Sequence, residues 1–183
     1  MTTDDLDDWL PDAQVRTRHR READATPEDL WAAAAAVRLD ETRTLGRLVR
    51  WRIPETPDDR SFSELLARYP FTVLAERRHA SLSGLCGRIW TFQRDYPRLS
   101  GPQDFRAWAE PGTVRVLFAH WVEELPGGRS ALLSEARVEP VDRGAATRLR
   151  SLWLVIGVFE RLIGAEPLAL AAARAERECP RGT

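Results

Sequence analysis

Three side chains in this sequence have residue types suited to catalysis. His120 interrupts the apolar positions of the segment 113–124, and a histidine can act as acid, base or hydrogen-bond donor near neutral pH. Arg88 follows a glycine-containing segment, and an inward guanidinium there could bind a carboxylate or an enolate oxygen. Cys86 has the residue type of a nucleophile but no recognisable base partner, so we interpret it as a small buried residue. His120 and Arg88 are therefore the candidate catalytic residues.

Each candidate has a structural alternative. His120 fits equally a core histidine that is hydrogen-bonded to a neighbouring carbonyl, and Arg88 fits an outward arginine that solvates the sheet. The three histidines, His19, His79 and His120, show no metal-ligand spacing, and neither do the two cysteines. The sequence also lacks a glycine-rich phosphate loop, a nucleophile elbow and a dinucleotide fingerprint. We predict neither a metal nor a cofactor.

The charge pattern argues against a nucleic-acid partner. All 27 basic side chains are arginine, the acidic ones number 28, and the net charge is −1. Affinity for nucleic acids comes mainly from clustered neutralisation of phosphates, which this balance does not favour. The absence of lysine and asparagine is typical of a GC-rich genome, so the arginine excess says little about partners.

The two ends of the chain look peripheral. Residues 1–13 carry an acidic cluster and no sustained period, so we expect a disordered or loosely attached arm, and residues 179–183 a flexible tail. The acidic start differs from a secretory signal, and the longest apolar run, 152–159, is far below the ~20 residues of a membrane span. We expect no membrane insertion, a cytoplasmic location and free thiols at Cys86 and Cys179.

Residues 14–178 predict a single domain with two kinds of period. Alternation over 14–23 and 113–124 and a β-rich composition over 71–77 and 82–92 predict strands, with a further short strand over 104–110. Gly84 and Gly87 suggest a bulge or a close backbone approach. Helices are expected over 27–37 behind Thr26 as N-cap, over 42–51 and over 62–69.

The C-terminal half is the clearest part of the pattern. Pro126, Gly127 and Gly128 predict a hairpin turn from the strand 113–124 into a strand over 129–141. After Asp142 the period becomes helical almost to the end, and Gly164 and Pro167 should kink or break that helix. Segregated helices and a sequential sheet of 6–7 strands give an α+β fold.

This order of elements resembles the helix-grip fold of the SRPBCC, or START-like, superfamily, in which a curved antiparallel sheet wraps around a long C-terminal helix. The segments 84–90, 105–112 and 133–138 resemble actinobacterial proteins of the polyketide cyclase/dehydrase-like group. The resemblance implies a cavity between sheet and helix but no fixed catalytic motif. Residues expected to line that cavity are Trp90, Val116, Phe118, His120, Ser134, Ala136, Leu152, Trp153 and Ile156.

Three functions remain open from the sequence. The first is binding of a hydrophobic small molecule such as a lipid, a polyketide or another aromatic metabolite in the cavity. The second is a cyclase or dehydratase with His120 and Arg88 as acid–base and oxyanion groups. The third is a protein-interaction module with a filled cavity. An outward apolar patch of Leu117, Trp121 and Leu133 would suit a homodimer.

Overall fold

The computed structural model describes residues 3–43, 59–91 and 96–178, apart from the side chains of Thr3, Asp4, Phe62 and 155–163. The chain divides into two compact units. Unit 1 comprises Met1–Thr17, Leu66–Ala119 and Glu135–Glu160, and unit 2 comprises Arg18–Leu65, His120–Ser134 and Arg161–Thr183. The elements in chain order are α1 (Thr3–Asp7), β1 (Val15–Ala23), α2 (Pro27–Ala35), the 3₁₀ turn η1 (Leu39–Glu41), α4 (Phe62–Leu66), β2 (Thr72–Arg77), β3 (Ala80–Gly87), α5 (Pro102–Ala107), β4 (Val114–Leu125), β5 (Arg129–Pro140) and α6 (Arg143–Glu178).

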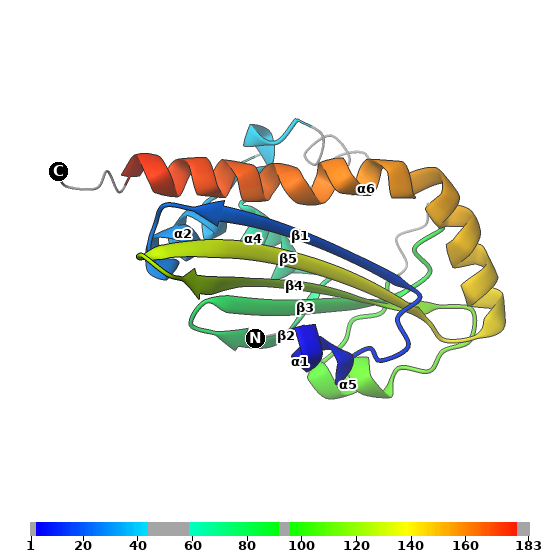
Figure 1. Cartoon of the computed structure of the whole chain (residues 1–183). Helices are drawn as coiled ribbons and strands as arrows, with labels where there is room; N and C mark the ends of the chain where they lie inside the picture. Colours follow the sequence, from blue (N-terminus) through cyan, green and yellow to red (C-terminus); the bar gives the residue numbers. More distant parts are fainter. Residues whose placement is uncertain (1–2, 44–58, 92–95, 179–183) are drawn as a thin grey trace. The chain divides into compact units, whose positions relative to one another are not determined.

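The strands form one antiparallel sheet in the order β1-β5-β4-β3-β2 (Figure 1). The α+β class is confirmed, with five strands among the described residues where we expected 6–7. The strand expected over 104–110 is one of those missing. In its place Pro102 begins the helix α5 directly after Gly101. The helix expected over 42–51 lies, from residue 44 onwards, outside the described residues.

Gly84 of β3 allows α5 to pack closely on the sheet within unit 1. A Cβ at this position would lie 2.6 Å from the Phe105 ring and 2.8 Å from Leu74 Cδ1. Phe105 itself is fully buried. The close backbone approach expected at Gly84 is therefore confirmed, and the partner is an aromatic side chain from a helix.

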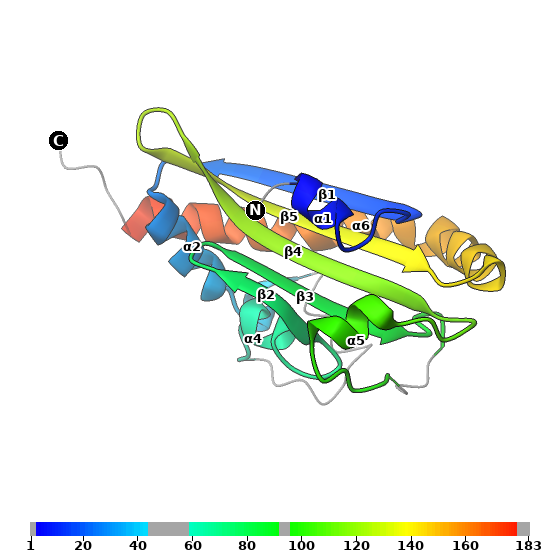
Figure 2. The same ribbon diagram turned by 90° about the horizontal axis from the view of Figure 1, so that it is seen from below.

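The N-terminal arm is a docked element of unit 1. Leu6 and Leu10 are fully buried, and Figure 2 shows α1 and α5 on the same face of the strands. The centres of the Trp9 and Phe105 rings are 6.2 Å apart. The Arg106 guanidinium lies 3.7 Å from the centre of the Trp9 ring. This placement differs from the loosely attached arm expected from the sequence. A five-residue helix is unstable alone, so burial of its leucines against the rest of the unit holds it in place.

Charged side chains lie buried on the face of β5 that the N-terminal arm covers. Arg137 is 0% exposed, and its guanidinium donates to Glu135 Oε1 and Asp7 Oδ1, both at 2.6 Å. The hydrogen bond from Arg137 is the largest cause that holds the pKa of Asp7 below its ordinary value. A second pair joins Arg115 of β4 to Glu139 of β5. The structure places these charges beneath the arm, where each needs a partner.

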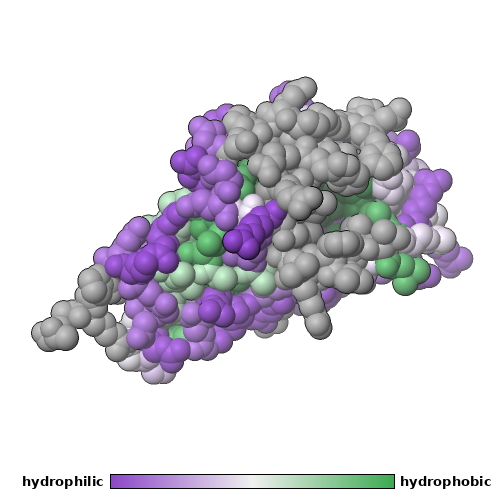
Figure 3. Space-filling model, turned by 90° about the horizontal axis from the view of Figure 1, so that it is seen from above, coloured by the Kyte–Doolittle hydropathy of each residue, from purple (hydrophilic) through white to green (hydrophobic). Residues whose placement is uncertain are grey.

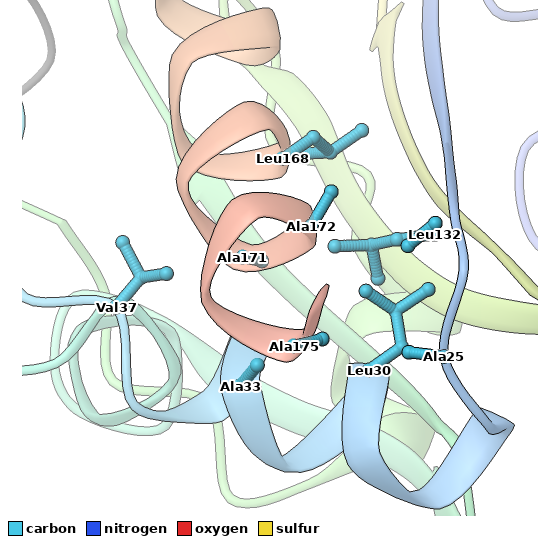
Figure 4. Packing of buried hydrophobic residues seen from close by; sticks show 10 residues of the cluster. Ala25, Leu30, Ala33, Val37, Leu132, Leu168, Ala171, Ala172 and Ala175 are labelled. Carbon is cyan, nitrogen blue, oxygen red and sulfur yellow. The ribbon is translucent and has the colours of Figure 1, made fainter. Parts of the chain in front are cut away.

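In unit 2 the core is built from short side chains. Figure 4 shows the alanines of α6 facing Leu30 and Ala33 of α2 and Leu132 of β5. The helix α2 begins behind Thr26, whose hydroxyl accepts from Asp29 N at 3.2 Å as the N-cap pattern predicts. Small residues allow two backbones to approach closely, so this alanine-rich end of α6 lies tightly on its neighbours. The buried cluster comprises Ala23, Ala25, Leu30, Ala33, Val37, Leu132, Leu168, Ala171, Ala172 and Ala175.

The helix α6 continues through both residues expected to interrupt it. Gly164 and Pro167 lie inside Arg143–Glu178, so of the kink or break expected there the break does not occur. Leu168 and the buried alanines beyond it anchor the following turns, which offsets the hydrogen bond that proline removes. Gly164 also faces His19 of β1, since a Cβ there would lie 2.1 Å from His19 Cδ2.

The apolar outer patch proposed for a dimer is not exposed. Leu117 and Leu133 are fully buried and Trp121 is 1% exposed, with its indole N–H donating to Glu123 Oε1 at 3.1 Å. On the face drawn in Figure 3, the described residues are mainly hydrophilic, and hydrophobic ones occur in small separate areas. This patch therefore gives no support to a homodimer. Among the described residues, no helix has the length and apolar character needed to cross a membrane.

Candidate functional site

The alternating faces of β4 and β5 position the candidate site residues. His120 Nε2 and Ser134 Oγ lie 3.1 Å apart, which places these two residues on one face of the hairpin. Side chains two residues apart on a strand share a face, so the whole set follows from this pair. We call it the inner face: Val114, Val116, Phe118, His120, Val122 and Glu124 from β4, and Ser130, Leu132, Ser134, Ala136, Val138 and Pro140 from β5.

The aromatic part of the site lies in unit 1. Large apolar side chains from separate segments pack against a buried aliphatic layer but stay only partly buried themselves. Within this set the Phe71 and Phe118 rings meet edge to face, with their centres 5.6 Å apart. We call the set the aromatic cluster: Phe71, Ile89, Trp90, Tyr96, Phe118 and Trp153. The aliphatic layer beneath it comprises Val15, Leu85, Val114, Val116, Val138 and Leu149.

The first turns of α6 bring Trp153 to this cluster. Asp142 caps the helix by accepting from Ala145 N at 2.7 Å and from Gly112 N at 2.5 Å. These backbone hydrogen bonds, that from Ala145 first, lower the pKa of Asp142. Leu149 is buried in the aliphatic layer, and Trp153 follows one turn later on the same side of the helix. The helix also places Arg148 5.9 Å from the centre of the Trp90 ring.

Several predicted lining residues meet in unit 1, and others do not. Trp90, Val116, Phe118 and Trp153 all belong to the aromatic cluster or its aliphatic layer. Ala136 and Leu152 are partly exposed, and the side chain of Ile156 lies outside the described residues.

Sequence reasoning missed three members of the cluster. Phe71 and Ile89 fall inside the strands predicted over 71–77 and 82–92 but were not assigned to the cavity, and in the structure they lie just outside β2 and β3. Tyr96 lies in the connection between β3 and α5, where a strand period gives no signal.

The polar part of the inner face lies in unit 2. His120 is partly exposed, yet desolvation lowers its pKa to about 4. At neutral pH the imidazole is therefore uncharged. His19 of β1 is partly exposed and packs against α6 at Gly164.

The second catalytic candidate lies elsewhere. Arg88 has a 54% exposed side chain, and its guanidinium is 4.0 Å from the Glu110 carboxylate. The cyclase hypothesis requires this arginine inside a cavity, and an exposed ion pair of this kind does not supply that. Cys86 is buried, and desolvation raises the pKa of its thiol to about 12. Among the described residues, no three His, Cys, Asp or Glu side chains are grouped to hold a metal ion.

Comparison with known proteins gives a general likeness of fold. No family model and no curated protein matches the chain. Among solved structures, the Zhui aromatase/cyclase from Streptomyces sp. R1128 is 13% identical, with a TM-score of 0.38 over 91% of this chain and 96% of that one. TTHA0849 from Thermus thermophilus is 11% identical, with a TM-score of 0.36 over 90% and 99%. The di-domain aromatase/cyclase BexL, from the BE-7585A biosynthetic pathway, is 11% identical, with a TM-score of 0.30 over 92% and 53%. At these values the function has to be argued from the site itself.

Proposed function

We propose that this protein binds a hydrophobic small molecule, such as a lipid, a polyketide or another aromatic metabolite, at the aromatic cluster of unit 1. The observation that carries the proposal is the partial exposure of six large apolar side chains on top of a fully formed aliphatic layer. The fold that we propose for the chain is the helix-grip arrangement, which fits the order of its elements.

The energetics favour a ligand at this position. Apolar surface that stays wet in the free protein is available to drive binding, at about 25 cal/mol for each Å² covered. A planar ligand that covers about 150 Å² of the cluster gains about 4 kcal/mol before the costs of association. The edge-to-face pair of Phe71 and Phe118 presents both a ring face and a ring edge, which suits an aromatic partner.

An enzyme of the cyclase or dehydratase type is the second candidate. It is favoured by the hydrogen bond between His120 and Ser134 on the inner face, since a neutral imidazole can exchange a proton with a bound substrate. Arg88 does not support this role, because its side chain is exposed and paired with Glu110. An interaction module would need an exposed apolar outer face, and Leu117, Trp121 and Leu133 are buried.

The test is a binding measurement with matched tryptophan variants. Thermal-shift screening against lipid and aromatic libraries should give stabilising hits, and native mass spectrometry of the purified protein should detect a co-purified ligand. Trp153→Leu should weaken binding of a hit at least several-fold. Trp9→Leu, which alters a partly buried tryptophan of unit 1 outside the cluster, should leave binding unchanged.

Two results would count against the proposal. One is the absence of any stabilising hit together with an empty native mass spectrum. The other is a hit that Trp153→Leu and Trp9→Leu weaken equally, because binding would then not involve the aromatic cluster.

A further inference from the structure

The N-terminal arm of unit 1 contacts arginines from four separate elements. The Arg137 guanidinium of β5 donates to Asp7 Oδ1 at 2.6 Å, and the Arg16 guanidinium of β1 lies 3.0 Å from the same oxygen. Arg77, at the end of β2, lies 3.8 Å from Asp5 Oδ2. The aspartates of the arm therefore meet positive charges that the fold has gathered from distant positions of the chain.

The apolar side chains of the arm are held beside these charges. Leu6 and Leu10 are fully buried. The Trp9 ring packs near the Phe105 ring of α5, and the Arg106 guanidinium lies over it, 3.7 Å from its centre. The same guanidinium donates to a backbone oxygen of the arm at 3.0 Å. We call the residues that receive the arm the docking surface: Arg16, Arg77, Phe105, Arg106 and Arg137.

The side chains beneath the arm suit a cover that can be removed. Arg137 and Glu135 are buried there, although apolar residues in place of a buried ion pair are often neutral or stabilising for a permanent cover. Glu135 Oε2 and Gln14 Oε1 are buried without a hydrogen-bond partner in the part of the chain that the structure describes. Each of these atoms costs free energy that contact with water recovers. The surface under the arm is therefore compatible with water as well as with the arm.

The arm itself is ordered only by docking. A five-residue helix such as α1 is unstable alone, so docking carries the cost of ordering this segment. A tethered segment offsets that cost through its effective concentration, which is on the order of millimolar for a short flexible linker. A segment of the same chemistry from another molecule can replace the arm when it binds the surface more tightly.

We propose that the N-terminal arm is an internal ligand of the docking surface, and that this surface binds an acidic segment of a partner protein, which displaces the arm. The chemistry of the partner follows from the arm, whose residues 4–10 are Asp-Asp-Leu-Asp-Asp-Trp-Leu. The partner segment carries pairs of acidic residues separated by single leucine or aromatic residues. The inference is independent of the proposed ligand, because no residue of the docking surface belongs to the aromatic cluster.

A labelled arm peptide tests binding between molecules. The probe is a fluorescein-labelled peptide of residues 3–12, and fluorescence anisotropy follows its binding to the full chain. In the native protein the tethered arm should exclude the peptide. In the open variant, which combines Leu6→Ser with Leu10→Ser, the arm loses its buried anchors, and the affinity for the peptide should rise about 10-fold or more. Added salt should weaken this binding, since it screens the ion pairs.

Matched arginine variants of the open protein locate the peptide. Arg106→Ala removes the guanidinium that lies over the Trp9 ring, and it should weaken peptide binding about 3- to 10-fold. Arg98→Ala is the control, because Arg98 also lies over an aromatic ring, that of Tyr69, outside the docking surface. It should leave the affinity unchanged.

Circular dichroism and thermal unfolding establish that each variant is folded. If the open variant does not fold, Asp7→Asn removes the carboxylate that binds Arg137 and should admit the peptide for the same reason.

Two further peptides test the class of partner. A peptide with Glu in place of each Asp and Phe in place of Trp keeps the pattern of the arm, and it should bind the open variant within about 5-fold of the arm peptide. A peptide with Asn in place of each Asp keeps the apolar residues alone, and it should bind about 10-fold more weakly or less.

Four results would overturn the inference. The arm peptide would bind the native and open proteins equally or neither of them, or Arg106→Ala and Arg98→Ala would weaken it to the same degree. Failure of the Glu and Phe peptide would exclude the proposed class of partner. A native protein that is dimeric in light scattering, and monomeric as the open variant, would assign the docking surface to the arm of a second copy instead.

Discussion

Replacing Gly164 of α6 with alanine tests how closely this helix approaches β1 in unit 2. The added Cβ would lie 2.1 Å from His19 Cδ2, 2.3 Å from its Nε2 and 3.0 Å from its Cγ, where ordinary contacts are 3.4–4 Å. The imidazole would have to move by more than about 1 Å. Overpacking of this kind costs about 1–3 kcal/mol. Alanine is better than glycine inside a helix by about 1 kcal/mol, so Gly164→Ala should lower the free energy of unfolding by about 0–2 kcal/mol.

The sign of the effect should reverse when the ring is removed. In a His19→Ala background the clash is gone, and Gly164→Ala should then raise the free energy of unfolding by about 1 kcal/mol. The coupling between the two sites is thus about 1–3 kcal/mol, well above the additivity error of distant sites. Urea unfolding followed by far-ultraviolet circular dichroism measures the free energy of unfolding of the native protein, the two single variants and the double variant. In thermal unfolding, a change of 1 kcal/mol moves the melting temperature by about 2–4 °C.

Gly144→Ala in the first turn of α6 provides the control. Its Cβ would meet Asp142 Oδ1 at 3.2 Å, a group that His19→Ala does not alter. Its effect should therefore be the same in both backgrounds. The close approach would be refuted if Gly164→Ala stabilised the protein equally with and without the His19 ring.

Three further predictions concern groups with unusual electrostatics. Arg137→Met should lower the free energy of unfolding by about 3–5 kcal/mol, because it leaves the Glu135 carboxylate buried without its cation. Adding Glu135→Gln should recover part of this loss in urea unfolding. Equal losses in the single and the double variant would contradict the prediction. Burial raises the pKa of the Cys86 thiol to about 12. In a Cys179→Ser protein this thiol should therefore resist Ellman's reagent at pH 8 until the fold is denatured. Prompt labelling of the native protein would show instead that the thiol is accessible. Asp142 has a lowered pKa in the folded state, so its stabilisation is present above the ordinary aspartate pKa of about 3.9 and disappears as the pH falls through the folded value. The melting-temperature difference between the native protein and Asp142→Ala should accordingly shrink below about pH 4, and a constant difference would exclude this carboxylate as the cause.

The sequence by itself determined the elements that depend on local chemistry. The hairpin was predicted with strand ends within one residue of β4 and β5, because alternation and the turn at Gly127 and Gly128 are encoded within a few positions. The start of α2 behind Thr26 follows from capping in the same way. Residues on the inner face, including His120 and Ser134, could be named because side chains alternate along a strand.

Only the tertiary structure decided which faces are covered and which side chains meet. The arm looked peripheral because its acidic residues have no local partner, yet Asp7 reaches Arg137, 130 positions along the chain. The same contact supplies a partner for Arg137, which is fully buried. Phe71 and Phe118 likewise meet across 47 positions of sequence. Alternation states only that two sides of a strand differ, and which side is buried depends on what packs against it, a long-range property that no local pattern contains.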